Sequence, residues 1–133
     1  MEIAIKSDVG QRRTLNEDAA GYFLNTQNVP MIVVCDGIGG HNAGDVASAM
    51  ALSHLGKRWE EESITDTEAA YQWLVKNIQA ENDRIFQKAN QYRELDGMGT
   101  TIVVAVVIGS ELLIANVGDS RAYLCRNYQL KQL

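Results

Sequence analysis

The spacing of hydrophobic and polar residues changes several times along the chain, and each change predicts a new element. The segment EIAIKSDVG alternates apolar with polar residues from Glu2 to Lys6, which predicts a half-exposed strand ending near Gly10. The polar segment QRRTLNED predicts a loop, and AAGYFLNT predicts a second strand. The run PMIVVCD is apolar up to its final aspartate and contains β-branched residues, which is typical of a buried strand.

A first helix is predicted after the glycine-rich turn GIGGHNAG. Asn42 or Gly44 is the candidate cap, and the helix should run to about Arg58. Its broad apolar face is formed by Val46, Ala49, Met50, Leu52 and Leu55.

A second helix is predicted to be longer. Thr65 and Glu68 have the spacing of a capping box, and apolar residues then recur at three- and four-residue steps to about Tyr92. The remaining sequence consists of strand-like runs, which turn at Gly109-Ser110, at 117–120 and at RNYQ. The order of strands, helices and strands predicts an α+β fold, in which helices pack on one face of an antiparallel sheet.

The length and composition indicate a globular domain. The chain has 133 residues, so it is one domain or part of one, and its apolar share of 46% is ordinary. The strand pattern continues up to Leu133, and three meandering strands without a covering helix leave a sheet face and an edge exposed. We therefore expect more chain to follow.

The charge pattern narrows the range of partners. Twelve Lys and Arg against 17 Asp and Glu give a net charge of −5, and the basic residues are scattered. Nucleic-acid binding needs a clustered positive face, so we expect no nucleic acid and favour metal cations. No signal peptide or membrane span is present in the sequence, and Cys35 and Cys125 each lie in an apolar run. We expect a soluble, cytoplasmic protein with two small buried thiols and no membrane partner.

The glycine-rich turn does not fit three common phosphate sites. Asp45 stands where a P-loop needs its lysine, and the dinucleotide-binding pattern fails at Asn42. A cysteine phosphatase needs an arginine six residues after its nucleophile, but His41 occupies that place after Cys35.

Acidic residues at turns leave oxygen-ligand chemistry as the remaining option. Glu17 and Asp18 follow the first loop, Asp36 ends the buried strand, and Asp119 lies in an expected tight hairpin. Each alone is most simply a turn residue. Together they match the preference of hard divalent cations for carboxylates from several segments. Arg13 either donates two parallel hydrogen bonds to a phosphate or forms half of a surface ion pair.

Four motifs resemble one known family. SDVGQRRTLNEDAAG, VVCDGIGGHNAGDVAS, GMGTTIVVAV and ANVGDSRAYL are similar, in order, to motifs of the bacterial metal-dependent PP2C-like (PPM) serine/threonine phosphatases. The resemblance implies an antiparallel β-sandwich flanked by helices (αββα), with two Mn²⁺ or Mg²⁺ ions between the sheets. It also implies that residues 1–133 are the N-terminal portion of a single phosphatase domain.

The resemblance assigns roles to individual residues. Asp18 matches a metal-site acid, Asp36 the carboxylate that bridges both ions, and Gly37 a residue whose carbonyl is a further ligand. Asp119 matches an acid that helps to hold a third, weaker ion. Arg13 matches the arginine that grips the substrate phosphate.

The resemblance also implies a reaction, partners and a missing part. The reaction is hydrolysis of phosphoserine or phosphothreonine in a protein substrate, and bacterial members often oppose a serine/threonine kinase. Animal-type members place a histidine where this chain has Ile38; His41 is either a substitute general acid or a helix-start residue bonded to backbone. The family's later aspartates, in SDG and DN segments, do not occur here. The alternative hypothesis is a catalytically deficient half-domain that acts as a binding or self-association module.

Overall fold

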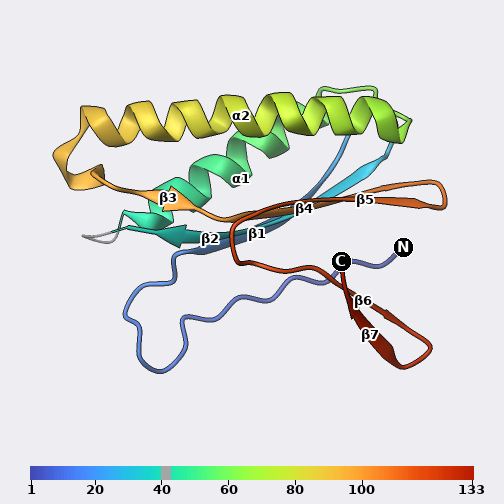
Figure 1. Ribbon diagram of the computed structural model, residues 1–133, viewed down its shortest axis with the longest axis horizontal. Coiled ribbons are helices and arrows are strands. Elements are labelled where there is room, and N and C mark those ends of the chain that lie inside the picture. The colour runs from blue at the N-terminus through green and yellow to red at the C-terminus, as the bar shows by residue number, and fades with distance from the viewer. Residues whose placement is uncertain (40–42) are drawn as a thin grey trace.

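A five-stranded antiparallel sheet forms the centre of the molecule (Figure 1). The computed structural model describes residues 1–39 and 43–133. The strands follow the order β1-β2-β4-β5, and the short β3 also pairs with β2. Their bounds are β1 (Asp18–Leu24), β2 (Pro30–Ile38), β3 (Gly99–Thr100), β4 (Ile102–Ile108) and β5 (Glu111–Val117). The apolar run that predicted a buried strand is therefore the central strand β2.

Two helices lie on the same side of this sheet (Figure 1). Helix α1 (Gly44–Glu60) packs on β1 and β2, and α2 (Thr67–Gln91) packs on α1 and β5. A short 3₁₀ helix, η2 (Arg93–Leu95), then leads into β3. The predicted α+β class, with helices packed on one face of an antiparallel sheet, is confirmed.

The core lies between α1 and the sheet, because alternate residues of β2 point toward the helices. Met31, Val33 and Cys35 are fully buried on that face, and Leu55 and Trp59 of α1 are fully buried against them. Burying a large apolar side chain stabilises a fold by roughly 1.5–3 kcal/mol, so this interface holds the sheet and α1 together.

Aromatic and polar contacts join the two helices. The Trp59 and Trp73 rings meet edge to face with centroids 5.0 Å apart, and the Trp59 indole N–H donates to the Val29 carbonyl at 2.9 Å. The buried Glu81 carboxylate accepts from His54 of α1 at 2.7 Å and from Arg84 at 3.0 Å. The contact between Trp59 and Trp73 and the bond between His54 and Glu81 fix α2 on α1, whereas the Val29 and Arg84 bonds support the two partners from outside this interface.

The opposite face of the sheet carries exposed apolar side chains. Tyr22 is 49% exposed and Val34 is 45% exposed, although both lie within strands. A separate two-stranded ribbon, β6 (Tyr123–Arg126) and β7 (Gln129–Gln132), lies on this side in Figure 1. Within the described residues, the β-sandwich that the resemblance implies is thus represented by one five-stranded layer and a two-stranded ribbon.

Two of the three predicted turns of the C-terminal region are confirmed as hairpin turns. Gly109 and Ser110 connect β4 to β5, and Gly109 has φ of +59°. Asn127 and Tyr128 connect β6 to β7 with φ of 52° and 61°, the left-handed values of a type I′ turn.

Two local predictions are wrong. Residues 2–10 do not form a strand, because no described strand offers their backbone a partner. The cap of α2 is Asp66, whose carboxylate accepts from the Ala69 N–H at 2.8 Å, and not Thr65. Both residues can cap a helix, and the position one residue later aligns with the first helical turn.

Two further expectations about the C-terminal region are also wrong. Asp119 does not lie in a tight hairpin, because β5 and β6 belong to different sheets and do not pair. Cys125 is exposed, since the ribbon that carries it has no packed layer over it among the described residues; Cys35 is buried as expected. No helix in the described ranges is both long and apolar enough to cross a membrane.

Candidate metal centre

The register of the sheet brings two aspartates face to face. Asp18 begins β1 and pairs directly with Asp36 near the end of β2. Side chains of directly opposite residues in an antiparallel pair project from the same face, with Cβ atoms about 4.5–5.5 Å apart. The two carboxylates therefore share one site although 17 residues separate them in the chain.

The two carboxylates of this pair repel each other when no cation lies between them. Partial burial, the carboxyl of Asp18 and the charges of Asp119 and Glu17 all raise the pKa of Asp36. Like charges placed directly across two strands are destabilising. A divalent cation between them would remove the repulsion, so the carboxylates fit a metal site.

A polar cavity of about 200 Å³ surrounds this pair. Its lining includes Arg13, Asn16, Asp18, Asp36 and Gly37. Arg13 reaches the cavity from the loop before β1, and neither of the two ion pairs in the described chain involves it. Its interpretation as half of a surface ion pair is therefore not met among the described residues, and phosphate binding by Arg13 stays a prediction.

Glycine is required at the end of β2 because α1 begins directly against it. A Cβ on Gly37 would collide with the Gly44 carbonyl, and one on Gly44 would lie 2.6 Å from the Glu17 carboxylate. The Gly37 N–H donates to the Glu17 carbonyl at 3.1 Å, and the buried Ser48 hydroxyl donates to the same carbonyl at 2.7 Å. The first turns of α1 thus fix the backbone that carries both carboxylates.

The protein side chains provide only part of a metal shell. Within residues 1–39 and 43–133, no three His, Cys, Asp or Glu side chains are grouped closely enough to hold an ion. Asp119 is absent from the cavity lining, although its charge acts on Asp36. Two carboxylates and the Gly37 backbone leave room for ligands from elsewhere, since hard divalent ions take six or more oxygens.

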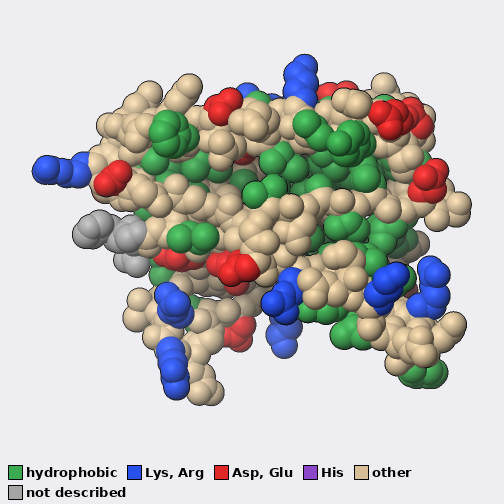
Figure 2. Space-filling view, viewed as in Figure 1, with side chains coloured by type: hydrophobic (Ala, Val, Ile, Leu, Met, Phe, Trp, Pro, Cys, Tyr) green, Lys and Arg blue, Asp and Glu red, His purple; other side chains and the backbone are tan. Residues whose placement is uncertain are grey.

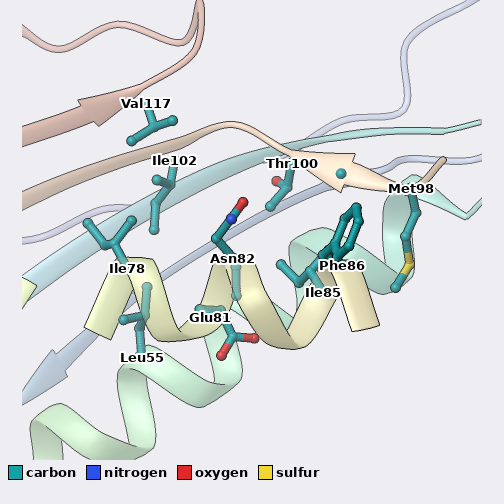
Figure 3. A pocket seen from close by; sticks show the side chains of 12 residues that line it. Leu55, Ile78, Glu81, Asn82, Ile85, Phe86, Met98, Thr100, Ile102 and Val117 are labelled. Atoms are coloured by element: carbon teal, nitrogen blue, oxygen red, sulfur yellow. The ribbon is translucent and has the colours of Figure 1, made fainter. Parts of the chain in front are cut away.

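A second cavity, of about 190 Å³, has a different character (Figure 3). It lies between the two helices and the strands and is lined mainly by apolar side chains, including Leu55, Ile78, Ile85 and Ile102. Its one buried acid, Glu81, is engaged by His54 and Arg84. Figure 2 shows hydrophobic side chains gathered along this boundary between α2 and the strands. Among the described residues, the candidate metal-binding and phosphate-binding side chains therefore line the polar cavity and not the apolar one.

The structure brings together five of the seven residues singled out from the sequence. One cavity is lined by Arg13, Glu17, Asp18, Asp36 and Gly37, and Asp119 lies near enough to influence Asp36. His41 lies outside the described residues.

Three residues of the site's framework were missed in the sequence. Ser48 and Thr101 are buried and bond to the segments that carry the acids, and Ser120 bonds to Thr101. Nothing in their spacing distinguishes them from ordinary core and turn residues, so only the tertiary contacts reveal them.

Comparisons with known proteins agree with this geometry. The family described as protein phosphatase 2C matches residues 11–133. The serine/threonine phosphatase stp of Listeria monocytogenes is 46% identical over 134 residues, which cover 100% of this chain and 53% of that protein. The chain thus spans about half the length of the curated relatives it matches.

Solved structures show the same arrangement of elements. The Streptococcus agalactiae serine/threonine phosphatase superposes with a TM-score of 0.95 at 37% identity, covering 99% of this chain and 54% of that one. The catalytic domain of the phosphatase PstP, solved in complex with two manganese ions, gives a TM-score of 0.81 at 33% identity. That match covers 96% of this chain and 52% of the other.

Proposed function

Because this chain belongs to the protein phosphatase 2C family, we propose that it forms one half of the catalytic site of a metal-dependent serine/threonine protein phosphatase. The observation that carries the proposal is the pairing of Asp18 with Asp36 in one cavity with Arg13. Two facing carboxylates suit a divalent cation, and a guanidinium beside them suits a phosphate dianion.

Each residue has a distinct proposed role. Asp36, which faces Asp18 and lies within the field of Asp119, would help to hold two ions. Asp18 and the Gly37 carbonyl would supply the rest of this chain's ligands, and Asp119 would help to hold a third, weaker ion. When bound, the ions would supply a water of lowered pKa and positive charge beside the phosphate oxygens.

Arg13 binds and orients the substrate. Its planar guanidinium can donate two parallel hydrogen bonds to a phosphate, which fixes the direction from which phosphorus is attacked. His41 is proposed only as a general acid for the leaving alcohol.

Mn²⁺ and Mg²⁺ both suit oxygen ligands, and the related PstP structure was solved with manganese. We propose Mn²⁺ or Mg²⁺ as the cofactor and phosphorylated proteins as the substrates, with an opposing kinase as a candidate partner. The additional carboxylates would come from further chain or from a second molecule. A cytoplasmic location stays a prediction.

The test is metal-dependent hydrolysis by the whole protein that contains these residues. An aryl phosphate and a phosphothreonine peptide would be assayed against increasing Mn²⁺, with Asp36→Ala compared with Asp83→Asn, a change at an exposed acid of α2. We expect activity that requires metal, falls at least about 100-fold in Asp36→Ala and is unchanged in Asp83→Asn.

Two other results would contradict the proposal. Activity that persists in chelator or survives Asp36→Ala would remove the metal site from the reaction. A folded protein that binds Mn²⁺ but hydrolyses neither substrate would favour the alternative, a catalytically deficient binding module.

A further inference from the structure

Thr101 occupies an unusual place in the sheet. β3 and β4 pair with β2 in one continuous register, in which Gly37 faces Thr100 and Val34 faces Val103. Thr101 lies between the end of β3 and the start of β4, and the shared register places it opposite Asp36. It is buried, with 4% of its surface exposed.

The Thr101 side chain replaces its own backbone in the ladder. The Thr101 N–H donates to the Asp36 carbonyl at 2.9 Å, as a regular pair requires. The Asp36 N–H, however, donates to the Thr101 hydroxyl oxygen at 3.1 Å, while the Thr101 carbonyl accepts from the Thr100 hydroxyl at 2.8 Å. The Asp36 N–H is thus bound by the Thr101 hydroxyl and not by the Thr101 carbonyl. Unlike a backbone carbonyl, this hydroxyl can also bond to a residue outside the sheet.

The same side chain also holds the turn that carries Asp119. The Thr101 hydroxyl lies 2.6 Å from the Ser120 hydroxyl, and Asn116 donates to the Ser120 carbonyl at 2.8 Å. On the other side of Asp119, a Cβ on Gly118 would lie only 2.7 Å from the Thr101 methyl carbon. Gly118, with φ of +106°, therefore allows the turn to pack directly on Thr101.

We infer that Thr101 is a positioning residue that sets the distance between Asp36 and Asp119, and so joins the binuclear site to the third-ion acid. The inference rests on the proposed function. The Thr101 hydroxyl contacts the backbone of Asp36 and the hydroxyl of Ser120, which follows Asp119. The Thr101 methyl group lies against Gly118, which precedes Asp119. Partners that orient metal ligands in this way typically change metal affinity by about 10–100-fold when removed.

The test uses three variants of the whole protein. Thr101→Val keeps the shape and removes the hydroxyl, Thr101→Ser keeps the hydroxyl and removes the methyl, and Thr26→Val is the matched control. Thr26 holds a different turn, because its hydroxyl donates to the Glu62 carbonyl at 2.8 Å. Mn²⁺ binding would be measured by calorimetry and by the spin-resonance signal of free Mn²⁺, with amide exchange at Asp36 followed by NMR.

We expect Thr101→Val to weaken Mn²⁺ binding about 10-fold and to speed exchange of the Asp36 amide. Thr101→Ser should restore both, and Thr26→Val should change neither. Wild-type Mn²⁺ binding that Thr101→Val leaves unchanged would overturn the inference alone. A wild type that binds no Mn²⁺ would overturn the proposed function and this inference with it.

A further variant covers the case in which Thr101→Val does not fold. Ser120→Ala keeps the bond between Thr101 and Asp36 and removes only the link to the Asp119 turn. We expect it to leave the Asp36 amide protected while weakening Mn²⁺ binding, by a smaller factor than Thr101→Val. Unchanged Mn²⁺ binding in a folded Ser120→Ala protein would contradict the coupling between the two acids.

Discussion

The two faces of β2 differ in what their residues do. On the helix-covered face, Met31, Val33 and Cys35 are fully buried in a close-packed core. On the opposite face, Val34 is 45% exposed and Asp36 meets the facing carboxylate of Asp18. One face of β2 thus packs in the core and the other holds the candidate metal-site acid, because successive side chains of a strand point in opposite directions.

This difference shows how a fold can tolerate an unfavourable charge pair. The facing aspartates repel each other, and their repulsion is opposed by the packing of the other face of the same strand. Removing a side chain from the covered face should therefore destabilise the fold, and neutralising an acid on the open face should stabilise the metal-free protein.

The largest expected contrast is in thiol reactivity. Burial raises the pKa of the Cys35 thiol to about 12, partly offset by its contact with Thr100. At neutral pH the reactive thiolate should be roughly 1000-fold scarcer than for an ordinary thiol, since each pKa unit is a factor of ten. In a Cys125→Ser background, reaction of Cys35 with a disulfide reagent would be compared with that of an added Val34→Cys.

Fast labelling is expected only at position 34, which lies next to Cys35 on the other face of the strand. Labelling of Cys35 at a comparable rate would contradict the described burial. A rate that rises with pH up to the highest values at which the protein stays folded would support it, because the thiolate then becomes more abundant.

The next contrast is in packing. Trp59→Ala should lower the free energy of unfolding by about 3–5 kcal/mol, because it opens a cavity in the core and removes the hydrogen bond from the indole to the Val29 carbonyl. Tyr22→Ala, on the open face, should lower it by no more than about 0.5 kcal/mol. Urea denaturation of both variants gives the comparison, and equal losses would show that the open face is covered in solution.

A smaller effect is expected at the polar contact between the helices. Glu81→Gln should lower the free energy of unfolding by about 1–3 kcal/mol, because it weakens the charge-assisted bonds from His54 and Arg84. Glu60→Gln, at the exposed end of α1, is the matched control and should be nearly neutral. If both substitutions are neutral, the buried contact does not stabilise the packing of α2 on α1.

The smallest effect has the opposite sign. The folded-state pKa of Asp36 is raised, so its ionisation costs stability at pH values above that pKa, and the cost disappears as the pH falls through it. In chelator at pH 7, Asp36→Asn should therefore raise the free energy of unfolding by roughly 0.5 kcal/mol, and the gain should shrink in acid.

With added Mn²⁺, the wild type should become more stable than Asp36→Asn. The metal should stabilise the wild type against urea and leave Asp36→Asn unchanged, because this variant lacks the carboxylate proposed to hold both ions. Destabilisation by Asp36→Asn in chelator would show that the facing acids are held by a favourable contact.

The sequence determined most of the elements and the type of chemistry. The apolar run of β2, the periodic stripe of α2 and the turns at Gly109 and Asn127 specify local structure through burial and backbone conformation. The acids at strand ends and turns indicated oxygen ligands for the same local reason. The resemblance then assigned roles to Asp18 and Asp36.

Only the tertiary structure decided which residues meet. Strand register placed Asp18 opposite Asp36, and packing brought Ser48 and Thr101 against the segments that hold them. The alternation near the N-terminus predicted a strand that does not form, since a strand needs hydrogen bonds from a neighbour that no local pattern supplies. Local preferences are set by each residue and its near neighbours, whereas a site made from distant segments depends on pairings that exist only in the folded chain.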